Sequence, residues 1–169
     1  MLGIEPSAIL SFRDEYIEFA TPENKENARY LAGKAFMLDE FLWNEAEKGH
    51  FGKEQFTKEN KKIYLHGHCH QKALASIVPT KKMLEFPENY AVVEIKSSCC
   101  GMAGSFGYEK EHYDVSMKVG ELVLLPAVRK AEDASLICAP GTSCRHQIKD
   151  GTGRTALHPA VILYDALVK

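Results

Sequence analysis

The sequence predicts an α/β fold in which a parallel sheet carries helices on both faces and follows a helical amino-terminal segment. Three short runs beyond residue 60 are rich in β-branched, aliphatic and aromatic residues, and helix-like stretches separate them. Strands that alternate with helices are typical of parallel sheets with right-handed crossovers. The expected strands are residues 62–66, 90–95 and 135–139.

The expected helices follow from apolar spacing. In the first 60 residues, Thr21-Pro22-Glu23 has the order of an N-cap, a first-turn proline and an early acidic residue, and apolar residues then recur every three or four positions through Ala46. Further helices are expected near residues 71–77, 108–119 and 121–133. The apolar positions between Ala160 and Val168 indicate a docked amphipathic helix.

The length of 169 residues and the 45% hydrophobic content suffice for one compact unit. We expect it to have two parts, residues 1–60 as a helical segment that completes a preceding repeat and residues 61–169 as a cysteine-rich domain. The repeat rests on a short likeness between residues 2–8 and 138–144. Both have an apolar run, a proline or glycine break, and a serine before a helical start.

Composition excludes several classes of partner. The chain has 21 basic and 23 acidic residues, a formal charge of −2, and no Lys/Arg run, so neither a nucleic acid nor an anionic membrane is an expected partner. The start lacks the pattern of a signal peptide, and no apolar stretch reaches the roughly 20 residues of a membrane span. We therefore expect a cytoplasmic protein, in which five cysteines indicate metal or redox chemistry.

Each expected strand is followed by a cysteine-bearing loop. The loops are His66–His70 (HGHCH), Ser98–Gly101 (SCCG) and Gly141–Cys144 (GTSC). In parallel α/β sheets, the loops after the carboxyl ends of the strands form the binding crevice. We therefore expect four thiols to converge and to bind one cofactor: Cys69, Cys99, Cys100 and Cys144.

Adjacent cysteines in a glycine-rich turn need a ligand, because two neighbouring thiols are otherwise exposed to oxidation. Gly101, Gly104 and Gly107 leave the backbone free to aim N–H groups at negatively charged sulfur. A helix that begins between Tyr108 and Glu111 would add its amino-terminal dipole. Hydrogen bonds to sulfur help to set the potential of iron–sulfur centres, so the loop suits such a centre.

The other candidate residues have simpler explanations as well. Cys138 lies in an apolar run and is expected to be a small buried hydrophobe. His66, His68 and His70 would share one face of an extended segment, opposite Cys69, and each alone is more often a hydrogen-bonded histidine than a ligand. His68 and His70 are nevertheless candidates for supporting or substitute ligands. In the third loop, Arg145 and His146 are candidates for stabilising a charged centre or meeting a partner.

Two other chemistries compete with an iron–sulfur centre. A structural zinc site uses four tetrahedral ligands, usually from pairs two to four residues apart, and neither Cys99-Cys100 nor Cys138-x5-Cys144 has that spacing. A thiol–disulfide enzyme is less favoured, because the chain has no C-x-x-C.

The three motifs together resemble a known family. HGHCHQKAL, SCCGMAGSFGYEKEHYDVSMKVGE and GTSCRHQI followed by ALHPA are similar to the CCG, or cysteine-rich, domain. That domain occurs in a subunit of heterodisulfide reductase, in the iron–sulfur subunit of glycolate oxidase, and at the carboxy-terminal end of FAD-linked oxidases and dehydrogenases of 2-hydroxy acids. The resemblance covers nearly the whole chain, and the CCGMAGSFGYE string is highly specific.

The resemblance implies an electron-transfer domain with an iron–sulfur cluster, of the 4Fe-4S type, in a flavin-linked dehydrogenase of a small 2-hydroxy acid such as D-lactate or glycolate. The chain shows no dinucleotide fingerprint, so FAD and substrate are expected in another domain or subunit, with a separate electron acceptor. The isolated chain is then not expected to be catalytic.

Two positions depart from the family pattern. Gly141 stands where the family has the first cysteine of a closing C-x-x-C, and Ala8 stands where the preceding repeat often has a cysteine. Three interpretations stay open: a four-cysteine cluster, a cluster completed by a nearby histidine, or a degenerate site that is empty or holds zinc. In the last case the chain would be a structural module of the same multidomain protein.

Overall fold

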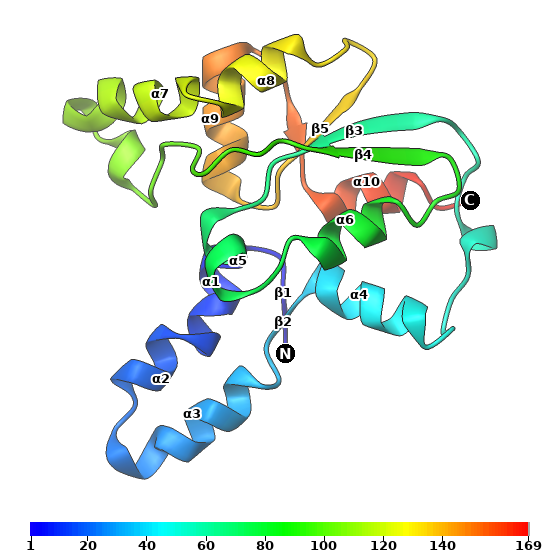
Figure 1. Ribbon diagram of the computed structural model, residues 1–169. Coiled ribbons are helices and arrows are strands. Elements are labelled where there is room, and N and C mark those ends of the chain that lie inside the picture. The colour runs from blue at the N-terminus through cyan, green and yellow to red at the C-terminus, as the bar shows by residue number, and fades with distance from the viewer. Residues whose placement is uncertain (169) are drawn as a thin grey trace.

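The computed structural model describes residues 1–168 and confirms the α/β fold (Figure 1). A four-stranded parallel sheet has the order β4-β3-β5-β6. Its strands are β3 (Lys61–Leu65), β4 (Tyr90–Glu94), β5 (Leu136–Cys138) and β6 (Ala156–Leu157). The first three coincide with the predicted strands to within two residues. The fourth was not predicted, because two residues are too few to show alternation.

Helices cover both faces of the sheet, as predicted. On one face, α8 (Leu124–Lys130) and α9 (Thr142–Thr152) pack over Ile137. On the other, α6 (Val78–Leu84) and α10 (Pro159–Asp165) pack over Cys138, its neighbour in the strand. Successive strand residues point to opposite faces, so each face has its own apolar core.

The amino-terminal segment is largely helical. Strand β1 (Leu2–Gly3) pairs in parallel with β2 (Phe36–Met37), and α2 and α3 form a hairpin that extends away from the sheet (Figure 1). The remaining elements are α1 (Pro6–Ile9), η1 (Leu10–Arg13), α2 (Glu15–Phe19), η2 (Pro22–Asn24), α3 (Lys25–Ala32), α4 (Leu38–Glu47), η3 (Lys53–Gln55), α5 (Cys69–Leu74), η4 (Phe106–Tyr108), η5 (Lys110–His112) and α7 (Tyr113–Glu121). Within residues 1–168, no helix has the length and apolar character that a bilayer crossing requires.

Three local expectations were wrong. Phe36 lies in a strand rather than a helix, since it pairs with Leu2. The helix expected from residue 108 begins only at Tyr113, because Glu109 is extended (φ −79°, ψ 133°) and separates two short 3₁₀ turns. Residues 66–70 are not one extended segment, since α5 begins at Cys69.

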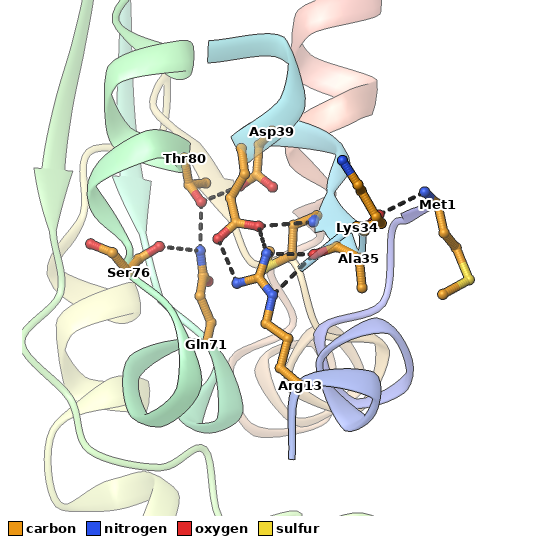
Figure 2. Close-up of polar contacts among 10 residues, drawn as sticks. Met1, Arg13, Lys34, Ala35, Asp39, Gln71, Ser76 and Thr80 are labelled. Carbon is orange, nitrogen blue, oxygen red and sulfur yellow. Dashed lines mark hydrogen bonds and ion pairs between the residues drawn. The ribbon is translucent and has the colours of Figure 1, made fainter. Parts of the chain in front are cut away.

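A polar network joins the amino-terminal segment to α4 (Figure 2). The Arg13 guanidinium donates to the Glu40 carboxylate at 2.6 and 3.1 Å and to the Ala35 carbonyl at 2.7 and 3.0 Å. Glu40 also accepts from the Met37 N–H at 3.0 Å. Because both charges are largely removed from solvent and every contact is a charge-assisted hydrogen bond, this pair fixes η1 against the start of α4.

A second branch of the network reaches the helix that carries Cys69. Asp39 accepts a hydrogen bond from the Thr80 hydroxyl, and Thr80 accepts one from the Gln71 side-chain amide at 2.6 Å (Figure 2). Gln71 lies in α5 and Asp39 in α4, so buried hydrogen bonds connect α4 with the first cysteine-bearing segment. Burial raises the pKa of the Asp39 carboxyl, although the bond from Thr80 opposes that shift.

Asp39→Asn tests this buried carboxyl. A raised folded-state pKa means that the folded protein binds the proton more tightly than the unfolded chain does. The stability that protonated Asp39 contributes is therefore fully present below the pKa of about 3.9 that an Asp has in the unfolded chain. It is lost as pH rises through the higher pKa that Asp39 has in the folded protein. Urea unfolding from pH 4 to pH 8 should show this fall in the wild type and not in the variant. Identical pH dependence in both proteins would contradict the assignment.

Candidate metal centre

Three cysteine-bearing segments leave the sheet at one edge. Strand β3 lies between β4 and β5, and Leu65 aligns with both Glu94 and Cys138. The pairing continues one residue further, because the His66 N–H donates to the Cys138 carbonyl at 2.9 Å. The loops that follow these three strands therefore start side by side, at the carboxyl edge where parallel sheets bind their ligands.

The structure brings the four predicted cysteines together in a row. The Cys99 thiol hydrogen-bonds to Cys69 and Cys100, and Cys100 hydrogen-bonds in turn to Cys144. The row runs from the surface inward, since Cys69 is exposed, Cys99 is intermediate, and Cys100 and Cys144 are buried. None of these four cysteines is in a disulfide.

Backbone N–H groups point at these sulfurs. The Gly101 N–H donates to Cys99 Sγ at 3.3 Å, the Ala103 N–H also bonds that sulfur, and the Met102 N–H bonds Cys100. The loop achieves this with a run of unusual backbone angles, φ +101° at Gly101, +41° at Ala103 and +71° at Gly104. Successive N–H groups in such a turn form a concave anion site, here built for negatively charged sulfur.

The thiols divide into two that hold protons and two that release them. Hydrogen bonds from Cys100 and Cys69 lower the pKa of Cys99, and the bond from Cys100 lowers that of Cys144 to about 5, with a further contribution from His66. The same bonds raise the pKa of Cys69 and Cys100, which act as the donors. These hydrogen bonds favour the thiolate form at Cys99 and Cys144, and thiolate is the form that binds metal.

Lys72, three residues after Cys69, is a cation close enough to interact with this charge. Its ammonium donates to the carbonyls of Ser97 and Ser98, immediately before the paired cysteines. Burial lowers the pKa of Lys72, while the thiolates of Cys144 and Cys99 act in the opposite direction. The lysine thus ties α5 to the CCG loop and partly offsets the negative charge of the sulfurs.

A fifth donor, His66, was not among the residues assigned from sequence. His66 is fully buried, and its ring lies with Cys100 and Cys144 in a group whose candidate ligand atoms are all within 4.8 Å of one another. Its Nδ1 lies 2.7 Å from the Ser97 hydroxyl, and within residues 1–168 its Nε2 has no well-aligned hydrogen-bond partner. The sequence offered one clue, the position of this polar residue directly after an apolar strand.

The histidines that were assigned from sequence lie differently. His68 caps α5, since its Nδ1 accepts from the His70 N–H at 3.2 Å. His70 is half-exposed, and its Nε2 lies 3.9 Å from the Glu15 carboxylate. The rings of His68 and His70 stack with their centroids 5.7 Å apart.

Gly141 explains why His68 fits where it does. A Cβ at Gly141 would lie 3.3 Å from Cys144 Sγ and 3.1 Å from His68 Nε2. A side chain at this position would therefore begin beside the sulfur row. In this chain the His68 ring occupies the space that such a side chain would fill.

The remaining candidates hold the third loop in place or lie outside the site. Arg145 donates to the carbonyls of Ala139 and Pro140 at 2.9 and 2.6 Å, so its guanidinium supports the loop before Cys144. His146 is exposed, and its Nδ1 lies 2.6 Å from the Tyr108 hydroxyl. Cys138 is buried in the core on the opposite sheet face, as expected for a small hydrophobe.

The donor set fits a thiolate-ligated metal centre. It combines four sulfurs, an unpartnered buried imidazole nitrogen, and backbone N–H groups that stabilise negative sulfur. Soft thiolate ligands select iron–sulfur centres and zinc, so the site residues fit either kind of metal.

Gly101→Ala tests the CCG loop. The added methyl would overlap the Ser116 carbonyl and approach Gln147 Nε2 to 3.0 Å, at a backbone angle that L-residues rarely adopt. We expect a loss of about 2–5 kcal/mol in unfolding free energy. Gly104→Ala is the matched control, because φ is also positive there but no atom lies within 4 Å, and it should cost only about 1 kcal/mol. Equal losses in urea unfolding would contradict the tight contact.

This chain is similar to segments of known dehydrogenases. The chain is 26% identical over 170 residues to one of the subunits of anaerobic glycerol-3-phosphate dehydrogenase of Escherichia coli K12, and 27% identical over 168 residues to D-2-hydroxyglutarate dehydrogenase of the same strain. Each match covers 99% of this chain, but the chain spans only 40% and 15% of those two proteins. D-2-hydroxyglutarate dehydrogenase of Haemophilus influenzae is also 27% identical, with 16% of its length covered. No family model and no solved structure matches the chain.

Proposed function

We propose that this chain is an iron–sulfur electron-transfer domain of a flavin-linked dehydrogenase that oxidises a small 2-hydroxy acid. One observation carries the proposal: four free cysteines from three separate loops form a continuous row at the carboxyl edge of the sheet. Backbone N–H groups aimed at the sulfurs support the same chemistry, because they stabilise the negative charge of a thiolate-bound centre.

The shape of the row favours a centre with several metals over a single ion. Around one tetrahedral zinc with bonds of about 2.3 Å, all four sulfurs would lie roughly 3.8 Å apart. The four sulfurs here do not all lie within 4.8 Å of one another, whereas His66, Cys100 and Cys144 do. A row of thiolates that includes two adjacent cysteines suits a cluster in which neighbours bind different irons.

The compact trio of His66, Cys100 and Cys144 supports one alternative, a structural zinc site. Two sulfurs and one imidazole nitrogen are ordinary zinc ligands, and a fourth from the row would close a tetrahedron. In that case the chain would organise its parent enzyme without carrying electrons.

When bound, an iron–sulfur centre accepts and donates single electrons. The residues of this chain would hold it and limit its exposure. Cys69 lies at the surface and gives the site an edge that a redox partner can approach, while Cys100 and Cys144 keep the inner side away from water. We place flavin and substrate in another domain or subunit, and the electron acceptor outside this chain. Similarity to D-2-hydroxyglutarate dehydrogenase supports a 2-hydroxy-acid substrate.

Metal analysis of two cysteine variants tests the proposal. The 169-residue chain is purified without oxygen and analysed for iron, sulfide, zinc and visible absorption. Cys100→Ser should lose most of the iron, because its sulfur bridges the middle of the row. Cys138→Ser, the matched control, should keep its iron and lose about 1–3 kcal/mol of stability through the buried hydroxyl. Stoichiometric zinc without iron or sulfide would favour the structural alternative.

The isolated chain should not turn over a hydroxy acid. It carries the sulfur row but no dinucleotide fingerprint, so it lacks a hydride acceptor. An assay of D-lactate, glycolate and D-2-hydroxyglutarate with an artificial electron acceptor should give no rate above background. Sustained turnover by the pure chain would mean that the catalytic site lies within these residues.

A further inference from the structure

We propose that His66 Nε2 is the fifth protein ligand of the metal centre, in place of the thiolate that Gly141 cannot supply. The inference rests on the proposed iron–sulfur function and deepens it, because it names a ligand that the cysteine pattern does not contain. The centre then has four sulfur ligands and one neutral nitrogen ligand from the protein.

The burial of His66 carries the first step. The side chain is completely removed from solvent, and no group in the described part of the chain forms a well-aligned hydrogen bond with its Nε2. A buried polar atom without a partner costs about 1–3 kcal/mol, so its position needs a compensating interaction. The sulfurs of Cys100 and Cys144 lie within 4.8 Å of a nitrogen of the same ring. A metal held by these sulfurs would satisfy the nitrogen.

The hydrogen bond on the other side of the ring supports the same role. When the single proton of the Ser97 hydroxyl goes to the Ile95 carbonyl at 3.4 Å, the hydroxyl oxygen accepts from His66 Nδ1–H at 2.7 Å. This arrangement places the proton of the neutral ring on Nδ1 and leaves a lone pair on Nε2. Metal-binding histidines commonly donate their other N–H in this way, which fixes the tautomer and the ring orientation.

The other two histidines of the segment are less suited to this role. His68 uses Nδ1 to cap α5, and its Nε2 faces the space beside Gly141. His70 has a side chain that is 42% exposed and lies near Glu15. Of these three rings, only that of His66 belongs to the group of converging ligand atoms. His68 therefore fills the volume of the missing cysteine, and His66 supplies the missing ligand.

The test uses pulsed EPR of the 169-residue chain, reconstituted without oxygen from ferrous iron and sulfide and then reduced. The expected result is a strong nitrogen hyperfine coupling that changes when histidine is labelled with ¹⁵N. His66→Cys should retain iron, lose this coupling and show a lower midpoint potential, because a thiolate is more electron-donating than imidazole. His68→Asn, which keeps a capping oxygen for α5, should retain the coupling.

Ser97→Ala separates the ligand role from a folding role. This variant leaves the His66 ring intact and removes the acceptor of Nδ1–H, so metal affinity should fall about 10- to 100-fold with the nitrogen coupling still present. Unchanged affinity in Ser97→Ala, with the apoprotein folded by circular dichroism, would count against the orienting bond and overturn the tautomer argument.

Different experimental results would overturn the role of His66 and the proposed electron-transfer function. Iron-loaded protein without histidine coupling would overturn the role of His66 and leave the electron-transfer proposal intact. Protein that takes up no iron would overturn that proposal, and titration with Co²⁺ alone would then decide the ligand. Weaker Co²⁺ binding by His66→Ala than by His68→Asn, both checked for folding, would support His66, whereas equal binding would exclude it.

Discussion

The parallel alignment of β3, β4 and β5 is the constraint on which the rest of the site depends. Parallel strands all end at the same edge of a sheet, so three loops that are far apart in the sequence begin side by side. The bond between the His66 N–H and the Cys138 carbonyl carries this alignment one residue beyond the strands. Two core layers hold the strands in register, and the sulfurs then meet without any covalent link between them.

Much of this arrangement follows from local sequence patterns. Apolar runs bounded by cysteine-bearing loops predicted three of the four main strands and the convergence of Cys69, Cys99, Cys100 and Cys144, because the alternation of strands and helices already implies one shared edge. The burial of Cys138 followed from its place inside an apolar run. The ligand assignment itself stays a prediction that only metal-bound protein can test.

The parts that were missed depend on contacts between distant residues. Strands β1, β2 and β6 have two residues each, and nothing in two residues distinguishes a strand from a loop until a partner is known. The importance of His66 arises from Ser97 on one side and the Cys144 sulfur on the other, both far from it in the chain. Treating HGHCH as one extended segment also hid its role, because α5 begins inside the motif at Cys69 and the three histidines are then not equivalent.

The negative charge of the buried sulfurs explains why a neutral histidine suits the position of His66. Cys100 is 4% and Cys144 is 1% exposed, and each further anion brought into such surroundings must be paired or neutralised. In the metal-free protein, hydrogen bonds raise the pKa of Cys69 and Cys100 and favour their protonated forms, and Lys72 offsets part of the charge of the other sulfurs. Binding of the proposed metal centre would replace those protons and convert all four sulfurs to thiolates. A fifth thiolate at Gly141 would add one more buried negative charge, whereas the His66 imidazole adds a ligand without adding charge. A neutral nitrogen ligand in place of a thiolate would also raise the reduction potential of the proposed centre, so the choice of ligand would affect electron transfer as well as stability.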